Sequence, residues 1–232
     1  MTGTGVDRQR PSRRTDTTVL IPAAGTGDRL GMGPKAFLEL AGRPMVAWVA
    51  EKALAVSDDV VVALPDGLEA AGFEICPGCR IIAGGPTRQD TVARLATMTD
   101  RPWSVLINGA NPLASIGLIW AVLEAAQETG VAGAFLASEV PAVEIRNGRV
   151  ISDFPRHAFG IVQTPQAFAT ALLKTLTSEA LRENRSEQST IQLALRAGRA
   201  VVAVPGEKTN LKITDHLDWL FATQLAGLLT SR

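Results

Sequence analysis

The sequence predicts an α/β fold in which a mostly parallel sheet is flanked by helices. Apolar runs of strand length alternate with amphipathic segments of helix length along the 232-residue chain. Hydrophobic residues make up 46% of the chain and charged residues 20%, a composition typical of globular proteins. A chain of this length buries roughly 70–75% of its unfolded surface, so one core needs neither disulfides nor metals. We therefore expect a single domain over residues 18–232, with a protruding β-arm at 138–159.

The predicted elements follow from local signals. Short apolar runs between turn-forming residues predict strands at 18–22, 60–64, 80–83, 104–107, 131–137 and 200–204. Apolar residues at helical spacing predict helices at 44–56, 88–98, 115–128, 165–177, 189–197 and 215–229. Pro44 is tolerated in the first turn of its helix, and Gly130 ends the third predicted helix. Asn147-Gly148 predicts a hairpin turn between arm strands at 143–146 and 149–152.

Two segments raise the question of targeting. Residues 1–17 are polar, contain several arginines and lack an apolar run, so we expect a disordered tail, with a transit peptide or an anion-binding arm as alternatives. Residues 103–123 carry no charge and are long enough for a membrane helix. Within them, however, Asn108-Gly109-Ala110-Asn111-Pro112 is rich in turn-forming residues and favours a strand, a polar loop and the start of a helix. We therefore expect no membrane partner.

The charge balance limits the partners. Lysine plus arginine and aspartate plus glutamate both number 23, so the chain has no overall basic field to hold duplex nucleic acid. We expect no nucleic-acid partner. Any anion site must be local.

The only two cysteines occur in Cys76-Pro77-Gly78-Cys79. A structural zinc ion needs four ligands, and the two histidines of the chain lie far away in sequence. A redox dithiol is typical of a helix N-terminus after a strand, whereas this segment precedes a predicted strand. A turn with two incidental thiols is the favoured interpretation. Two free thiols favour a reducing cytoplasm.

The segment after the first strand is rich in small residues, reading Ala23-Ala24-Gly25-Thr26-Gly27, and continues to Pro34-Lys35. Ligands of open α/β sheets bind beyond the carboxyl ends of the strands, and successive N–H groups of such a loop can cradle phosphate. The loop lacks the third glycine of a dinucleotide fingerprint and the Gly-Lys-Ser/Thr of a P-loop. Its cations, Arg29 and Lys35, suit a polyphosphate whose charge shifts during reaction. A flexible loop with two solvated charges is the alternative.

This loop resembles the signature of nucleotidyltransferases that act on sugar and polyol phosphates, which have a Rossmann-like sheet. Among these, the chain is most similar to the 2-C-methyl-D-erythritol 4-phosphate cytidylyltransferase family. Further segments match that family in order, namely 84–92 (GGPTRQDTV), Arg156, 163–168 (QTPQAF) and 210–214 (NLKIT). The resemblance spans roughly residues 19–225.

The resemblance implies a nucleotide site for CTP. The backbone around the first loop would hold the nucleotide, through Ala23, Ala24, Gly25 and Gly27. The second segment would lie near the cytosine, through Gly85, Arg88 and Thr91. Arg29 and Lys35 would stabilise the transition state, with Mg²⁺ as the cofactor.

The resemblance also implies an acceptor site and an assembly. Arg156 and Lys212 would position the acceptor phosphate, with Thr164 beside it. The arm at 138–159 would cross to a partner subunit, making a homodimer with shared sites.

Several positions depart from the family pattern. The family segment H-D-A-A-R-P reads Ile107-Asn108-Gly109-Ala110-Asn111-Pro112 here. Asn108 replaces the aspartate that helps to hold Mg²⁺, and an amide oxygen is a weaker ligand than a carboxylate. Asn111, at the acceptor-binding position, replaces an arginine. The D-T-I-K of the family arm aligns with 143–146, which reads V-E-I-R.

The expected function is transfer of CMP from CTP to a polyol phosphate, 2-C-methyl-D-erythritol 4-phosphate, with release of pyrophosphate. An acceptor phosphate with a second pKa of roughly 6 is already anionic at neutral pH, so no general base is required. Intact cations favour an active enzyme, whereas the two asparagines leave two alternatives open. These are a cytidylyltransferase for another polyol phosphate, such as ribitol 5-phosphate, and a weakly active nucleotide-binding paralogue.

Overall fold

A seven-stranded sheet with the order β11-β7-β10-β6-β1-β4-β5 forms the centre of the protein, in a computed structural model that describes residues 12–230. The strands are β1 (Thr17–Pro22), β4 (Val60–Leu64), β5 (Arg80–Ala83), β6 (Trp103–Leu106), β7 (Val131–Ala137), β10 (Gly160–Ala169) and β11 (Val202–Pro205). Neighbouring strands are parallel except where β10 pairs with β6 and β7. The prediction of a mostly parallel sheet is confirmed.

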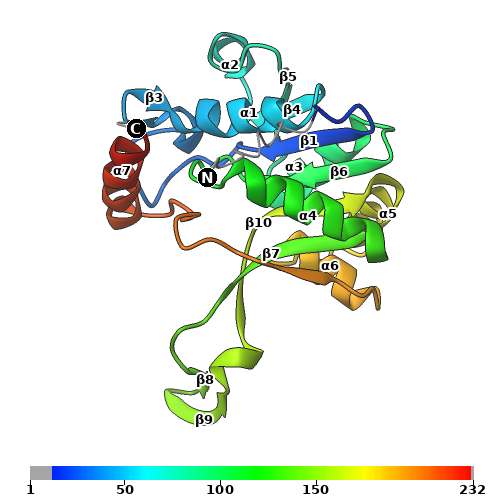
Figure 1. The fold of residues 1–232 in the computed structure, drawn as a ribbon, viewed down its shortest axis with the longest axis vertical. Helices are drawn as coiled ribbons and strands as arrows, with labels where there is room; N and C mark the ends of the chain where they lie inside the picture. The colour runs from blue at the N-terminus through cyan, green and yellow to red at the C-terminus, as the bar shows by residue number, and fades with distance from the viewer. Residues whose placement is uncertain (1–11, 231–232) are drawn as a thin grey trace, which may run out of the picture.

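Helices cover both faces of this sheet (Figure 1). The helices of the chain are α1 (Met45–Val56), α2 (Glu69–Ile75), α3 (Arg88–Thr97), α4 (Ile116–Thr129), α5 (Thr170–Arg182), α6 (Thr190–Arg196) and α7 (His216–Thr230), of which α7 packs at one end of the sheet in a separate cluster. Val19 and Ile21 of β1 pack in one core cluster with α1 and α4. Leu20 points to the other face and packs with α3, α5 and α6. Because both faces of β1 are buried, its sequence is a continuous apolar run without alternation.

The predicted arm is confirmed. Strands β8 (Ala142–Arg146) and β9 (Arg149–Phe154) pair antiparallel, and the single-turn helix η2 (Arg156–Ala158) follows them. Asn147 and Gly148 have φ values of 50° and 73°, the conformation of the expected tight turn. The hairpin extends away from the sheet at the lower end of Figure 1. It leaves large apolar side chains exposed, among them Ile145 and Val150 at 63% and 64%.

The predicted helix at 165–177 is wrong at its start. Residues 165–169 belong to β10, which inserts antiparallel between β6 and β7, and the helix α5 begins at Thr170. Ala167 and Phe168 are fully buried in this strand. A short apolar run fits a buried strand and a buried helix equally well, and only its pairing partners decide between them.

Smaller differences concern the ends and the short elements. The expected tail over 1–17 is too long, because Thr17 begins β1 and Arg14 pairs with Ser57 in an isolated bridge. The part of that tail before residue 12 lies outside the described residues. Short elements escaped prediction, namely α2, the helix η1 (Lys35–Phe37) and the hairpin of β2 (Glu39–Leu40) and β3 (Arg43–Pro44). Each is too short to show a clear periodicity.

Two expectations about special segments can be compared with the structure. Residues 103–123 form β6, a loop and the first half of α4, as expected. Within residues 12–230, no helix has both the length and the apolar character to cross a bilayer.

Cys76 and Cys79 are both free, and burial raises the pKa of Cys76 to about 11 and that of Cys79 to about 12. Such thiols are mostly protonated at neutral pH, which agrees with two incidental cysteines.

Candidate active site

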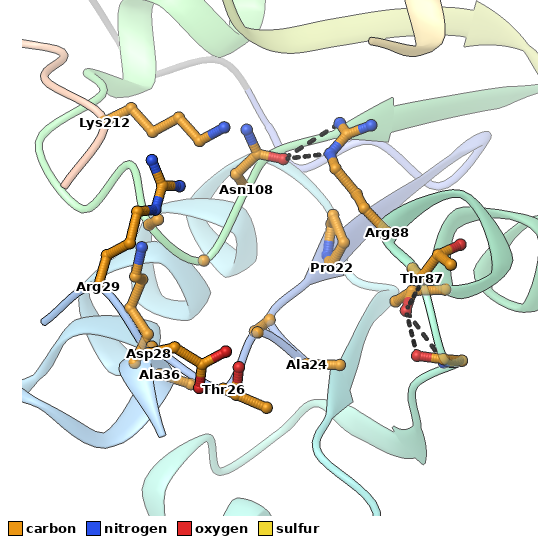
Figure 2. A pocket seen from close by; sticks show the side chains of 18 of the residues that line it. Pro22, Ala24, Thr26, Asp28, Arg29, Ala36, Thr87, Arg88, Asn108 and Lys212 are labelled. Carbon is orange, nitrogen blue, oxygen red and sulfur yellow. Dashed lines mark hydrogen bonds between the residues drawn. The ribbon is translucent and has the colours of Figure 1, made fainter. Parts of the chain in front are cut away.

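A cavity of about 400 Å³ opens at the carboxyl ends of β1, β5 and β6. The loops that follow these strands supply most of its wall, through residues 22–29, 85–88 and 108–110. Lys35, Ala36, Thr91 and Lys212 complete it (Figure 2). The sequence analysis assigned seven residues to the nucleotide, and all line this cavity: Ala23, Ala24, Gly25, Gly27, Gly85, Arg88 and Thr91.

The loop after β1 folds back on itself around Gly27. The N–H of Ala23 donates to the carbonyl of Ala63 at 2.8 Å, which continues the pairing of β1 with β4 beyond the strand. Gly27 has a φ of 80°, and a Cβ there would lie 2.5 Å from the carbonyl oxygen of Gly33. Only glycine fits this position. The turn brings Lys35, whose N–H donates to the carbonyl of Gly25 at 3.4 Å, back to the cavity wall.

The loop after β5 lies in close contact with the first loop. A Cβ on Gly84 would lie 2.2 Å from the Cβ of Ala24, so the backbone of Gly84 packs directly against the Ala24 side chain and leaves no room for a side chain of its own. The hydroxyl of buried Thr91 accepts a 3.0 Å hydrogen bond from the N–H of Gly85 and so anchors this loop to α3. Thr87 and Asp90 form a capping box that starts α3. Arg88 is therefore the first residue of an anchored helix.

Arg29, Lys35 and Lys212 bring positive charge to the cavity wall. The amine of Lys35 donates to the carbonyl of Ile213 at 3.0 Å. Burial lowers the pKa of Lys35, and the neighbouring charges of Arg29 and Lys212 lower it further. Burial also lowers the pKa of Lys212, followed by the charges of Arg88 and Arg29. Cations that repel one another across one cavity attract a polyanion strongly.

Arg88 and Asn108 also line this cavity and are hydrogen-bonded to each other. The Arg88 guanidinium donates two hydrogen bonds to Oδ1 of Asn108, at 3.3 and 3.2 Å (Figure 2). It donates a third to the hydroxyl of Thr190 at 3.3 Å. Burial lowers the pKa of Arg88. These two partners are neutral oxygen atoms, so the wall keeps a full positive charge.

A second cavity, of about 450 Å³, adjoins the first. Arg88, Asn108 and Lys212 line both cavities, so these three side chains stand where the two spaces meet. The second cavity is otherwise lined by polar and apolar residues of β10 and of the loops around residues 188–192 and 208–212. Asn111 and Thr164, assigned to the acceptor by the sequence analysis, also line it.

Asn111 and Thr164 are held in a buried hydrogen-bond network. Oδ1 of Asn111 accepts from the hydroxyl of Thr164 at 3.2 Å and from Nδ2 of Asn108 at 3.3 Å. Nδ2 of Asn111 donates to Oδ1 of Asn210 at 3.0 Å. Asn210 in turn donates to the carbonyl of Thr164 at 2.7 Å. Asn111 and Thr164 are each 2% exposed, so they shape the cavity wall more than they reach into it.

The chain is similar to known proteins of one enzyme family. A profile of the 2-C-methyl-D-erythritol 4-phosphate cytidylyltransferase family matches residues 17–227. The enzyme of that name from Thermus thermophilus is 41% identical over 219 residues, 91% of this chain and 97% of the relative. The chain belongs to this cytidylyltransferase family. Its reaction is CTP-dependent cytidylyl transfer in isoprenoid-precursor synthesis.

Further relatives agree in sequence and in fold. The cytidylyltransferase of Deinococcus radiodurans is 37% identical over 212 residues, 91% of this chain and 90% of the relative. The crystal structure of the Thermus thermophilus enzyme has a TM-score of 0.77 at 38% identity and covers 90% of this chain and 98% of its own. The synthase from Anaerococcus prevotii has a TM-score of 0.80 at 22% identity over 92% and 99%, which shows the shared fold.

One of the site residues expected from the sequence lies elsewhere in this cytidylyltransferase. Arg156 is exposed on η2 at the end of the arm and lines neither cavity. The arm extends away from the sheet that carries both cavities (Figure 1). Within one copy of the chain, the structure therefore does not bring Arg156 together with Arg29, Lys35 and Lys212.

The sequence analysis missed residues that anchor the second cavity. Gln163 donates to the carbonyl of Glu207 at 3.0 Å and accepts from its N–H at 3.1 Å, so β10 holds the loop after β11. Lys52 of α1 donates to the carbonyl of Pro112 at 2.6 Å and so anchors the loop that carries Asn108 and Asn111 to α1. Long-range contacts of this kind leave no signal in one sequence.

The donor set of the two cavities does not fit a protein-held Mg²⁺ ion. Among the described residues that line them, Asp28 is the one carboxylate. The Oδ1 of Asn108 is already the acceptor of the Arg88 guanidinium, so a metal ion there would face a fixed positive charge. Residues 12–230 contain no cluster of histidine, cysteine, aspartate or glutamate that could hold a metal. The structure therefore does not place Asn108 as a metal ligand.

Proposed function

We propose that the first cavity binds CTP, that the second binds 2-C-methyl-D-erythritol 4-phosphate, and that transfer of CMP takes place beside Lys212. The position of Lys212 carries this proposal, because its side chain lines both cavities. A cation at the junction reduces the repulsion between two anionic substrates and favours their in-line approach. Family membership supports the choice of both substrates.

The chemistry needs charge stabilisation more than proton transfer. An oxygen of the acceptor phosphate attacks the α-phosphorus of CTP, a new P–O bond forms, and the bond to the β-phosphate breaks. The electron pair leaves with pyrophosphate. Arg29 and Lys35 stand beside the glycine loop and neutralise the charge that develops on the leaving group. A phosphate with a second pKa of roughly 6 needs no general base.

The active assembly is a homodimer in which the arm of one copy reaches the site of the other. The exposed apolar side chains of the arm support this, because such a surface is typical of an interface. So does Arg156, a phosphate-binding type of side chain that lies away from both cavities of its own chain. In the dimer, Arg156 of one copy would position the acceptor phosphate in the other.

Two further features complete the proposal. The enzyme works in the cytoplasm, where CTP is available and where its two free thiols stay reduced. Mg²⁺ enters with the phosphates of CTP, since substrate phosphates are its usual ligands at nucleotide sites.

Pyrophosphate release tests the reaction. Purified protein is incubated with CTP and Mg²⁺, and with 2-C-methyl-D-erythritol 4-phosphate, ribitol 5-phosphate or no acceptor. We expect release with the first acceptor alone. Equal release with ribitol 5-phosphate would overturn the choice of acceptor, and no release with either would show that this chain has lost the activity of its family.

Mixed dimers test the shared site. Lys35→Ala and Arg156→Ala variants, each inactive alone, form one intact site per heterodimer if Arg156 acts across the interface. Random mixing then restores about a quarter of the wild-type rate. Mixing Lys35→Ala with Arg29→Ala restores nothing if both residues serve the site of their own chain, and is the matched control. Absence of rescue in the first mixture would show that Arg156 does not act across the interface and would overturn the shared site.

A further inference from the structure

The second cavity is built for an anion. Among the described residues, its lining contains three cationic side chains, Arg88, Lys208 and Lys212, and no carboxylate. Amide and hydroxyl groups supply most of the rest of its polar surface, including Gln163, Gln188 and Ser189. Two of the cations also line the first cavity, whereas Lys208 lines only the second. Of these three cations, Lys208 is thus the one that does not also face the nucleotide.

The backbone that carries Lys208 is anchored on both sides. One residue before it, Glu207 exchanges two hydrogen bonds with the side chain of Gln163, at 3.0 and 3.1 Å. Two residues after it, Asn210 is 1% exposed and bonds both Asn111 and the carbonyl of Thr164. The position of Lys208 at the cavity is therefore fixed by the same network that shapes the cavity wall.

The side chain of Lys208 is held by a partner that an anion can replace. Its amine forms an ion pair with Glu139, in the segment that joins β7 to the arm. The two side chains are 70% and 71% exposed. Exposed ion pairs contribute little to stability, so a doubly charged phosphate in the cavity competes well with one exposed carboxylate. Glu139 itself does not line the cavity.

We infer that Lys208 is a specificity-determining residue that binds the phosphate of the acceptor and leaves its ion pair with Glu139 to do so. This inference rests on the proposed function and adds a residue to its acceptor site. Because Lys208 does not line the nucleotide cavity, it acts on acceptor binding and leaves the transfer step to the cations shared by both cavities.

Steady-state kinetics separate this role from a structural one. Lys208→Gln raises the KM for 2-C-methyl-D-erythritol 4-phosphate about tenfold at low salt and leaves kcat and the KM for CTP within about twofold of wild type. Lys208→Arg restores most of the affinity. Because the charge of Lys208 is exposed, the ratio of the acceptor KM of Lys208→Gln to that of wild type falls as salt is added. The matched control is Lys174→Gln, which removes a lysine of the distant helix α5 that forms an ion pair with Asp100.

The direction in which Glu139→Gln changes the acceptor KM distinguishes phosphate binding from a structural role. Glu139→Gln frees Lys208 and removes a competing negative charge, so the KM for the acceptor stays unchanged or falls. If Lys208→Gln and Glu139→Gln raise the KM alike, the pair only anchors the arm, and the inference is overturned. An unchanged KM in Lys208→Gln overturns it as well.

Calorimetry distinguishes this inference from the proposed function. Titration of 2-C-methyl-D-erythritol 4-phosphate into each variant, with a CTP analogue that cannot react at the α-phosphorus, measures acceptor binding without turnover. Weaker binding to Lys208→Gln supports the role of Lys208 even if the wild type releases no pyrophosphate, a result that contradicts only the proposed reaction. Equal binding to both, or to neither, overturns the role of Lys208.

Discussion

The guanidinium of Arg88 donates two hydrogen bonds to the Oδ1 atom of Asn108, at the wall where the two cavities meet. A neutral amide therefore stands where the family resemblance implies a carboxylate, and the positive charge of Arg88 is left without a counter-ion at this position. This pair makes the asparagine tolerable, because the amide oxygen still accepts hydrogen bonds from the half-buried guanidinium.

Asn108→Asp tests the consequence for the metal. The new carboxylate pairs with Arg88 and supplies a Mg²⁺ ligand that Asn108 does not provide, at the cost of the hydrogen bond that Asn108 donates to Asn111. We expect faster turnover and a Mg²⁺ concentration for half-maximal activity lower by about tenfold. Pyrophosphate release measured over a Mg²⁺ series checks both. An unchanged metal dependence would show that the new carboxylate does not reach the ion.

We expect Lys212→Met to lower the activity and raise the thermal stability. Burial lowers the pKa of Lys212, and the charges of Arg88 and Arg29 lower it further, so its positive charge is unfavourable until an anion binds. We expect the variant to melt at a higher temperature than wild type without substrates, while kcat/KM falls at least about a hundredfold. Thermal melting with and without CTP, followed by the kinetic assay, checks this. A lower melting temperature in the variant would contradict the expected repulsion.

Gly84→Ala disturbs the nucleotide site through the backbone. The added methyl group would lie 2.2 Å from the Cβ of Ala24, so the two loops must move apart. We expect a loss of about 2 kcal/mol in the free energy of unfolding and at least about tenfold weaker CTP binding. Gly117→Ala is the control, because an added Cβ there meets only the Ser115 hydroxyl at 3.6 Å. Normal CTP affinity in Gly84→Ala would show that the loops are free to separate.

Lys52 gives the stability a predictable dependence on pH. Burial lowers its pKa from 10.5 to about 8 in the folded chain. Between these values the unfolded chain binds more protons, so the contribution of Lys52 to the free energy of unfolding rises with pH through this window and is constant below it. The slope is at most about 1.4 kcal/mol per pH unit. Denaturant unfolding of wild type and Lys52→Met across the window measures the difference, with Lys174→Met as control; parallel curves for wild type and Lys52→Met would contradict the shift.

The local pattern of the sequence determined much of the fold and of the first cavity. Buried strands such as β1 and β4 read as apolar runs, and the glycine loop with Arg29 and Lys35 follows β1 directly. Residues of one loop after one strand stay together whatever the rest of the chain does, so Gly25, Gly27 and Lys35 were predictable as a unit.

Tertiary structure alone decided the features that depend on distant partners. The run 165–169 became a strand because β6 and β7 offered it two edges to pair with. Lys212 reached the junction of both cavities, and Lys208 the second cavity, because Gln163 and Asn111 anchor their loop across the fold. Arg156 lies away from both cavities of its own chain because the arm that carries it extends from the sheet. Hydrophobic period and loop chemistry are local properties of the sequence, whereas contacts between segments far apart in the chain exist only once the sheet has assembled.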